Sequence, residues 1–121
     1  MRIFKTKQFA RIATRERISD SVLRDTIRRA EAGLIDADLG GGVIKQRIAR
    51  QGQGRSGGYR SIILFKRQSV SFFVYGFAKN DRDNIDQMEL RAYRSLAAEM
   101  LALDDEALYL SKRNGTIVEI E

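Results

Sequence analysis

Five basic side chains stand out because their types and spacing could bind and cleave a phosphodiester. Lys45 and Arg47 alternate along one predicted strand, and Arg60 stands early in the next. Lys79 and Arg82 come where a third predicted strand ends. Guanidinium groups bind phosphate oxygens through two parallel hydrogen bonds, and ammonium groups bind them as point charges. A cluster of these five cations could therefore hold several phosphates.

Such a cluster could also cleave RNA, because RNA carries its own nucleophile in the 2′-hydroxyl. Cleavage requires that this hydroxyl lose its proton, that the pentacoordinate phosphate be stabilised, and that the leaving 5′-oxygen gain a proton. Crowded cations lower the pKa of a neighbouring lysine or tyrosine, which makes it a better base, and arginines can stabilise the phosphorane charge. The same residue types are compatible with a protein that binds RNA without cutting it.

Alternation of apolar and polar residues predicts a hairpin that gathers three of these cations. A strand over 43–49 would place Lys45 and Arg47 on one face, because successive side chains of a strand point to opposite faces. A second strand over 59–65 would pair with it and bring Arg60 beside them. The segment that joins the two strands is rich in glycine, which lets a backbone approach a ligand closely.

Helices and further strands complete one predicted α+β domain over 1–121. Apolar residues recur at helical spacing in 5–15, and again after a Ser19 cap as far as Gly33. This pattern predicts an amphipathic helical hairpin packed on an antiparallel sheet. The remaining predicted elements are a central, aromatic-rich strand over 70–78, a helix over 83–101, a short helix over 104–110 and a closing strand over 116–120.

The composition excludes several classes of function. The chain has 121 residues and contains neither Cys nor His. It therefore cannot use a thiol nucleophile, cysteine-ligated zinc or a Ser-His-Asp triad, and it lacks the usual ligands of transition metals. No apolar stretch approaches the roughly 20 residues that a membrane helix needs, and none follows the basic N-terminus as in a signal peptide. We expect a cytoplasmic protein without membrane contact.

The positive charge is concentrated in the segment that carries the candidate hairpin. The chain has 22 Lys and Arg against 16 Asp and Glu, a formal net charge of +6. Eight basic residues and no acidic residue fall within 39–80, so this segment supplies the whole excess. An uncompensated run of like charge indicates a polyanionic partner such as nucleic acid, although a solvated basic surface has the same composition.

Three stretches of the sequence resemble the toxins of bacterial type II toxin–antitoxin modules. They are 36–47, with three consecutive glycines before Lys45; 54–60, which ends in Gly-Tyr-Arg at Arg60; and 75–85, which contains Ala-Lys-Asn. The most specific part is the glycine- and arginine-rich hairpin followed by the aromatic strand. The similarity runs over nearly the whole chain and is closest to the HigB branch of the RelE/ParE superfamily.

The resemblance implies a RelE-like microbial ribonuclease fold and a metal-independent endoribonuclease that needs no cofactor. Toxins of this kind cleave mRNA in the ribosomal A site, use the 2′-hydroxyl as nucleophile and so block translation. The resemblance also implies a cognate antitoxin, HigA-like and with a helix-turn-helix domain, whose complex with the toxin binds operator DNA. The expected partners are this antitoxin, the ribosome and mRNA.

The resemblance further assigns expected roles to individual residues. Arg60 matches the arginine that stabilises the phosphorane, and Lys45 matches a candidate general base beside Arg47. Lys79 or Arg82 matches the candidate general acid or phosphate clamp. These five are the expected catalytic residues, whereas the expected RNA- or ribosome-binding residues are Arg50, Arg55, Tyr59, Lys66 and Arg67. Tyr59 could stack on a base or could simply cover the sheet.

Two other interpretations stay open from the sequence. Because the superfamily includes toxins that poison DNA gyrase, the chain could be a non-catalytic binder of RNA or of gyrase. It could also act mainly as a corepressor with its antitoxin, in which case the isolated protein would be harmless on expression. RNA cleavage on the one hand and altered DNA supercoiling on the other would discriminate between the first two classes.

Overall fold

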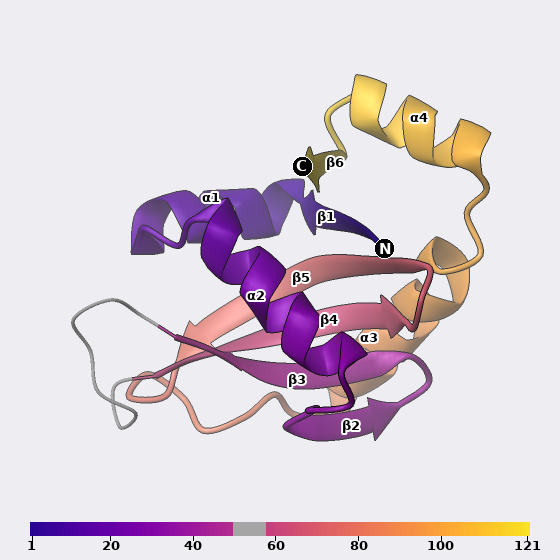
Figure 1. Ribbon diagram of the computed structural model, residues 1–121. Helices are drawn as coiled ribbons and strands as arrows, with labels where there is room; N and C mark the ends of the chain where they lie inside the picture. Colours follow the sequence, from indigo (N-terminus) through magenta and orange to yellow (C-terminus); the bar gives the residue numbers. More distant parts are fainter. Residues whose placement is uncertain (50–57) are drawn as a thin grey trace.

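The computed structural model describes residues 1–49 and 58–121, which form a sheet with helices on both faces (Figure 1). Arg50 and Arg55, two of the expected RNA-binding residues, lie outside the described residues. The strands are β1 (Arg2–Thr6), β2 (Ala37–Gly40), β3 (Val43–Ile48), β4 (Tyr59–Lys66), β5 (Val70–Ala78) and β6 (Ile117–Ile120), and the helices are α1 (Lys7–Glu16), α2 (Asp20–Glu31), α3 (Gln87–Met100) and α4 (Asp105–Arg113).

The predicted α+β class is confirmed, and the basic segment forms the expected antiparallel hairpins. β3 pairs with β4 and β4 with β5, close to the predicted bounds. The sequence did not reveal β1 or β2. The six-stranded sheet has the order β2-β3-β4-β5-β1-β6, and β1 runs parallel to β5. The sheet is therefore mixed, where the sequence predicted a purely antiparallel one.

The two N-terminal helices cover one face of the sheet. α1 follows β1 without a loop, because Thr6 ends the strand and its Oγ1 accepts a hydrogen bond from Phe9 N at 3.2 Å. Ser19 caps α2 as predicted, and Gly33 follows the end of that helix with φ +88°. The apolar sides of both helices pack on Phe73 and its neighbours in the core.

α3 and α4 pack on the opposite face, where they enclose a second core cluster around Phe72. α3 begins later than predicted because Asp86 caps it, in a reciprocal capping box with Glu89. The turn between β2 and β3 consists of glycines with positive φ. A Cβ atom on Gly42 would lie 2.7 Å from Leu101 Cδ1, so the turn fits closely against the end of α3.

Candidate active site

Arg47 and Arg60 lie directly opposite each other across the β3–β4 pair. Lys45 stands two residues earlier on β3, opposite Ile62. Because side chains alternate along a strand, all three cations project to the face that carries Val43 and Ile62, which is the face of α3. Arg47 is exposed, and the other two are partly buried. The prediction that the hairpin gathers these three residues is confirmed.

β3 is held in register from the other face of the sheet by Gln46. This buried side chain accepts a hydrogen bond from Asp36 N at 2.6 Å and donates one to Leu34 O at 3.1 Å. In β4, Ser61 Oγ donates to the main-chain carbonyl of Gln46 at 3.0 Å. A register shift would leave these buried groups without partners, which is costly. The cations on either side of Gln46 must therefore point to the face of α3.

The arrangement of Arg47 and Arg60 is electrostatically unfavourable for the free protein. Like charges directly opposite each other on neighbouring strands destabilise a sheet. In addition, Nη1 of Arg60 is buried and makes no hydrogen bond to any residue that the structure describes. A buried donor without an acceptor destabilises the protein further. An anion bound between the two guanidinium groups would remove both penalties.

Arg82 lies near the same three cations, because it packs on Phe77, the register partner of Arg60 in β5. The guanidinium carbon of Arg82 lies 5.7 Å from the centroid of the Phe77 ring. Its Nη1 and Nη2 donate to the two carboxylate oxygens of Glu89 at 3.2 and 2.6 Å, and Nη1 also donates to Tyr75 Oη at 3.4 Å. These hydrogen bonds raise the pKa of Arg82 and lower that of Glu89. Arg82 thus stays charged, which suits a phosphate clamp better than a general acid.

Lys79 lies at the same end of the sheet as Arg60. It follows β5 directly, and its backbone N–H donates to Gly58 O at 3.3 Å, one residue before β4 begins. Its side chain is exposed. The structure thus places all five expected catalytic residues at or near this end of the β3–β4–β5 sheet.

Three other expected RNA-binding residues are buried or lie far from the cluster. Tyr59 is only 1% exposed and belongs to the core under α1 and α2, and burial raises the pKa of its phenol. Of the two roles expected of Tyr59, the structure supports the one in which it covers the sheet. Lys66 and Arg67 lie at the far end of β4, roughly 20 Å from Arg60 at about 3.3 Å per residue. Arg67 there donates to Glu31 O at 3.3 Å.

Comparison with known protein families identifies the family of the chain. The family model for the RelE toxin of RelE/RelB toxin–antitoxin systems matches residues 1–120. The chain belongs to the RelE toxin family. It is accordingly the toxin of a toxin–antitoxin system, with a cognate antitoxin as partner. No individual curated protein matches the chain.

The described residues of the toxin lack two further features. No helix within 1–49 or 58–121 is long and apolar enough to cross a membrane. In the same part of the chain, no three His, Cys, Asp or Glu side chains gather where they could hold a metal ion.

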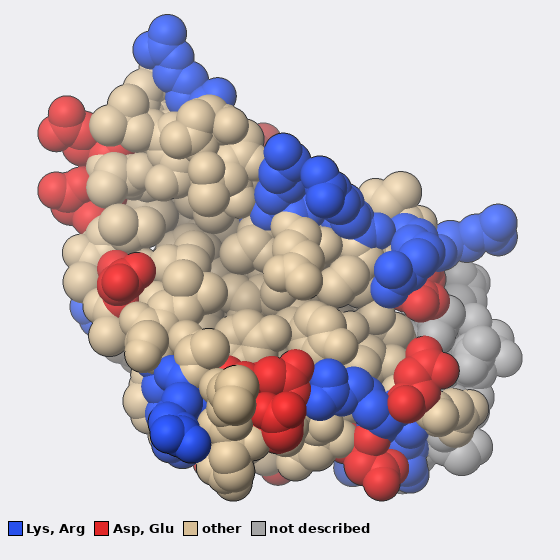
Figure 2. Space-filling view, turned by 180° about the vertical axis from the view of Figure 1, so that it is seen from behind, with Lys and Arg blue, Asp and Glu red and all other residues tan. Residues whose placement is uncertain are grey.

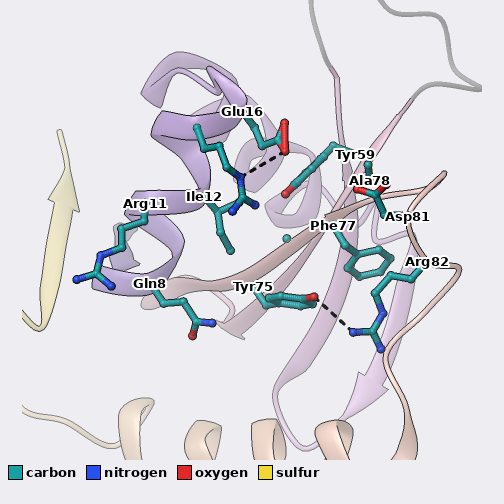
Figure 3. A pocket seen from close by; sticks show the side chains of 12 residues that line it. Gln8, Arg11, Ile12, Glu16, Tyr59, Tyr75, Phe77, Ala78, Asp81 and Arg82 are labelled. Atoms are coloured by element: carbon teal, nitrogen blue, oxygen red, sulfur yellow. Dashed lines mark hydrogen bonds and ion pairs between the residues drawn. The ribbon is translucent and has the colours of Figure 1, made fainter.

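The sequence did not reveal a cavity of about 400 Å³ that adjoins the cationic cluster of the toxin. β1 pairs with β5 only as far as Phe73, and α1 forms the wall opposite the part of β5 that follows. Figure 2 shows basic side chains in a row beside a hollowed, mostly uncharged surface. Figure 3 shows Tyr75 and Phe77 pointing into the cavity, with Arg82 beside them. Arg11 and Arg15 stand four residues apart in the sequence, and this spacing could have indicated that one side of the helix is basic.

Proposed function

We propose that this toxin is a ribosome-dependent mRNA endonuclease that cleaves RNA by attack of the 2′-hydroxyl. The observation that carries the proposal is the direct pairing of Arg47 with Arg60, together with the buried, unsatisfied Nη1 of Arg60 among the described residues. A phosphate between these groups would accept their hydrogen bonds. The negative charge of that phosphate increases in the pentacoordinate transition state, so the two arginines would stabilise this state more than the substrate.

The neighbouring residues supply the proton transfers that cleavage requires. In the proposed reaction, the side-chain nitrogen of Lys45 accepts the proton of the 2′-hydroxyl, whose oxygen then bonds to phosphorus. The bond from phosphorus to the 5′-oxygen breaks, and Lys79 donates a proton to that oxygen. The products are a 2′,3′-cyclic phosphate and a 5′-hydroxyl. Arg82, held by Glu89, clamps a phosphate oxygen and transfers no proton.

The ribosome fits this proposal for a physical reason. The cluster offers positive charge but few groups that read a base, so it can bind any RNA phosphate. A ribosome would present one unpaired stretch of mRNA to the cluster in a fixed orientation, and positioning of this kind supplies much of a rate enhancement. We accordingly expect codon-dependent cleavage on ribosomes and little cleavage of free mRNA.

The test is to map cleavage of a defined mRNA by primer extension in a translation reaction, with and without ribosomes. The wild-type toxin should cut at codon positions only when ribosomes are present. Arg60→Ala should lower the cleavage rate about 10²- to 10³-fold, as removal of one transition-state donor commonly does. Arg113→Ala, which removes an exposed arginine of α4, is the matched control and should cut as the wild type does.

Two outcomes would contradict the proposal. Intact mRNA together with altered DNA supercoiling would identify the toxin as a gyrase poison. Equal cleavage by a correctly folded Arg60→Ala variant would show that the reaction takes place elsewhere on the molecule. Circular dichroism and thermal unfolding of both variants establish that the folds are equivalent.

A further inference from the structure

We infer that the cavity between α1 and the end of β5 is a subsite for one unpaired nucleotide of the RNA, next to the phosphate held by Arg60. The inference rests on the proposed function and extends it, because it names a second part of the substrate and the residues that receive it. Among the expected site residues that the structure describes, Tyr59 and Arg82 line this cavity and the others do not.

The floor of the cavity is aromatic. Tyr75 and Phe77 line it with ring centroids 5.8 Å apart and ring planes inclined at 33°. Proteins that bind single-stranded RNA commonly stack its bases on aromatic rings and on guanidinium planes. Arg82, whose guanidinium group lies over both rings, supplies such a plane at one side. A volume of about 400 Å³ falls in the range of sites for small organic ligands.

The wall of the cavity is cationic. Arg11 and Arg15 line it from α1, and Lys7 continues the row toward the start of that helix. The three residues recur every fourth position, so they lie on one side of α1, and all are exposed. This charge is complementary to the phosphates on either side of a bound nucleotide.

Polar groups that could contact the edge of a base also line the cavity. The Gln8 amide can both donate and accept hydrogen bonds, and the carboxylates of Glu16 and Asp81 can accept them from amino groups of a base. Oε1 of Glu16 lies 3.7 Å from Nε of Arg15, and this ion pair keeps the Glu16 carboxylate at the wall of the cavity. The combination of stacking surface, cations and hydrogen-bonding groups is what a nucleotide requires.

The cavity is continuous with the cationic cluster through β5. Phe77 lines the cavity and is also the register partner of Arg60 on β4. Neighbouring strands are about 4.8 Å apart, so a phosphate at Arg60 lies within one nucleotide of the cavity. Arg82 belongs to both places, since it lines the cavity and stacks on Phe77. A bound base would thereby fix the position of the scissile phosphate.

Another conceivable occupant is an extended acidic segment of a protein, added as a strand to the edge of β5. Such a strand would need only main-chain groups and positive charge. The two aromatic rings with a guanidinium group above them favour a planar base, and for this reason the proposal is a nucleotide. Removal of single bases from a bound RNA distinguishes the two, because an acidic strand offers no base.

The test measures binding of a fluorescent 2′-O-methyl RNA hexamer, which lacks the attacking hydroxyl, by anisotropy. Arg11→Ala should weaken binding about tenfold. It should also lower the slope of log Kd against log salt by about one, as expected for the loss of one phosphate contact. Arg113→Ala, which removes the same charge from α4, is the control and should bind as the wild type does. Hexamers with one abasic position should reveal a site where loss of the base weakens binding to the wild type about tenfold.

Three results would overturn the inference. The first is equal binding by Arg11→Ala, Arg113→Ala and the wild type. The second is affinity that is independent of every base, and the third is polyphosphate of equal charge binding as tightly as the hexamer. Either of the last two would show that the cavity recognises negative charge and no base. Because the hexamer cannot be cleaved, these results are independent of whether the toxin cuts mRNA, so failure of the subsite and failure of the proposed function are separable.

Discussion

Arg47 and Arg60 are register partners on the antiparallel strands β3 and β4, so two positively charged residues stand directly opposite each other on neighbouring strands. Among the described residues, the buried Nη1 of Arg60 has no hydrogen-bond partner, so the free toxin leaves this donor unsatisfied. The hairpin register that forces the pair together is fixed on the opposite face by the buried Gln46 side chain. Stability and activity should therefore respond in opposite directions at this pair.

The first prediction concerns Arg47→Thr. Threonine is favourable in a strand, and replacing Arg47 removes the positive charge that repels Arg60. The free energy of unfolding should rise by about 0.2–1 kcal/mol, while the cleavage rate falls. Urea denaturation and primer extension measure the two quantities. A variant that loses both stability and activity would show that Arg47 contributes to the fold and would contradict the electrostatic interpretation.

The second prediction concerns Glu89, which we regard as a positioning residue for Arg82. Glu89→Gln keeps the size of the side chain but removes the charge that fixes Arg82 over Phe77. The site becomes more positive and less ordered, so KM should fall while kcat falls about tenfold. Glu99→Gln, an exposed change on the same helix, is the control. A purely structural role would lower the melting temperature without separating kcat from KM.

The third prediction is a pH dependence at Glu119. Its carboxylate accepts hydrogen bonds from Arg2 Nε at 2.9 Å and from Lys112 Nζ at 2.7 Å, and so connects β6 to β1 and α4. The hydrogen bond from Arg2 is the largest cause that lowers the pKa of Glu119 to about 2. Because the folded-state pKa lies below the unfolded value, the stabilisation is present above pH 4.5 and is lost as the pH falls toward 2.

Glu119→Gln should remove this dependence. The variant should lose about 1–2 kcal/mol of stability at neutral pH, as expected for hydrogen bonds to a charged group, and should keep its cleavage activity. Chemical denaturation between pH 7 and pH 3 measures the effect. If the free energy of unfolding falls equally steeply with pH below 4.5 in the variant and the wild type, another carboxylate causes the pH dependence.

The fourth prediction concerns Gly76→Ala near the C-terminal end of β5. A Cβ atom at this position would lie 2.6 Å from Tyr59 Cε1 and 3.2 Å from Phe9 Cε2, both in a buried region. Overpacking of this kind commonly destabilises a protein by about 1–3 kcal/mol. Thermal unfolding measures the loss, with Ser95→Ala on the exposed side of α3 as the control. An unchanged melting temperature would mean that Tyr59 moves easily and is not a fixed part of the core.

Alternation along single strands was sufficient to predict the part of the site on β3 and β4. Lys45, Arg47 and Arg60 follow from a period of two and from one hairpin. The same register also places Tyr59 opposite Ile48, so the apolar neighbour could have indicated that Tyr59 faces the core. The pairing of Arg82 with Glu89 depends on how the chain turns after β5, and local spacing does not encode that path.

Other features depend on contacts that are distant in sequence. β1 has five residues and leads directly into α1 at Thr6, so its pattern merges with that of the helix. Its place in the sheet is set by pairing with β5 and β6, more than 60 residues away. The cavity arises because β1 stops at that point and α1 leaves the sheet. Neither the parallel strand nor the cavity can be read from a short stretch of sequence.

The central claim is that the cluster around Arg47 and Arg60 cleaves RNA through the 2′-hydroxyl of its substrate. The most direct test uses an mRNA with a single 2′-deoxynucleotide at a mapped cleavage position, in the ribosome-containing reaction. We expect cleavage to disappear at that position alone, and the unmodified mRNA to yield 2′,3′-cyclic phosphate and 5′-hydroxyl ends. Cleavage that persists at the deoxynucleotide would contradict this mechanism.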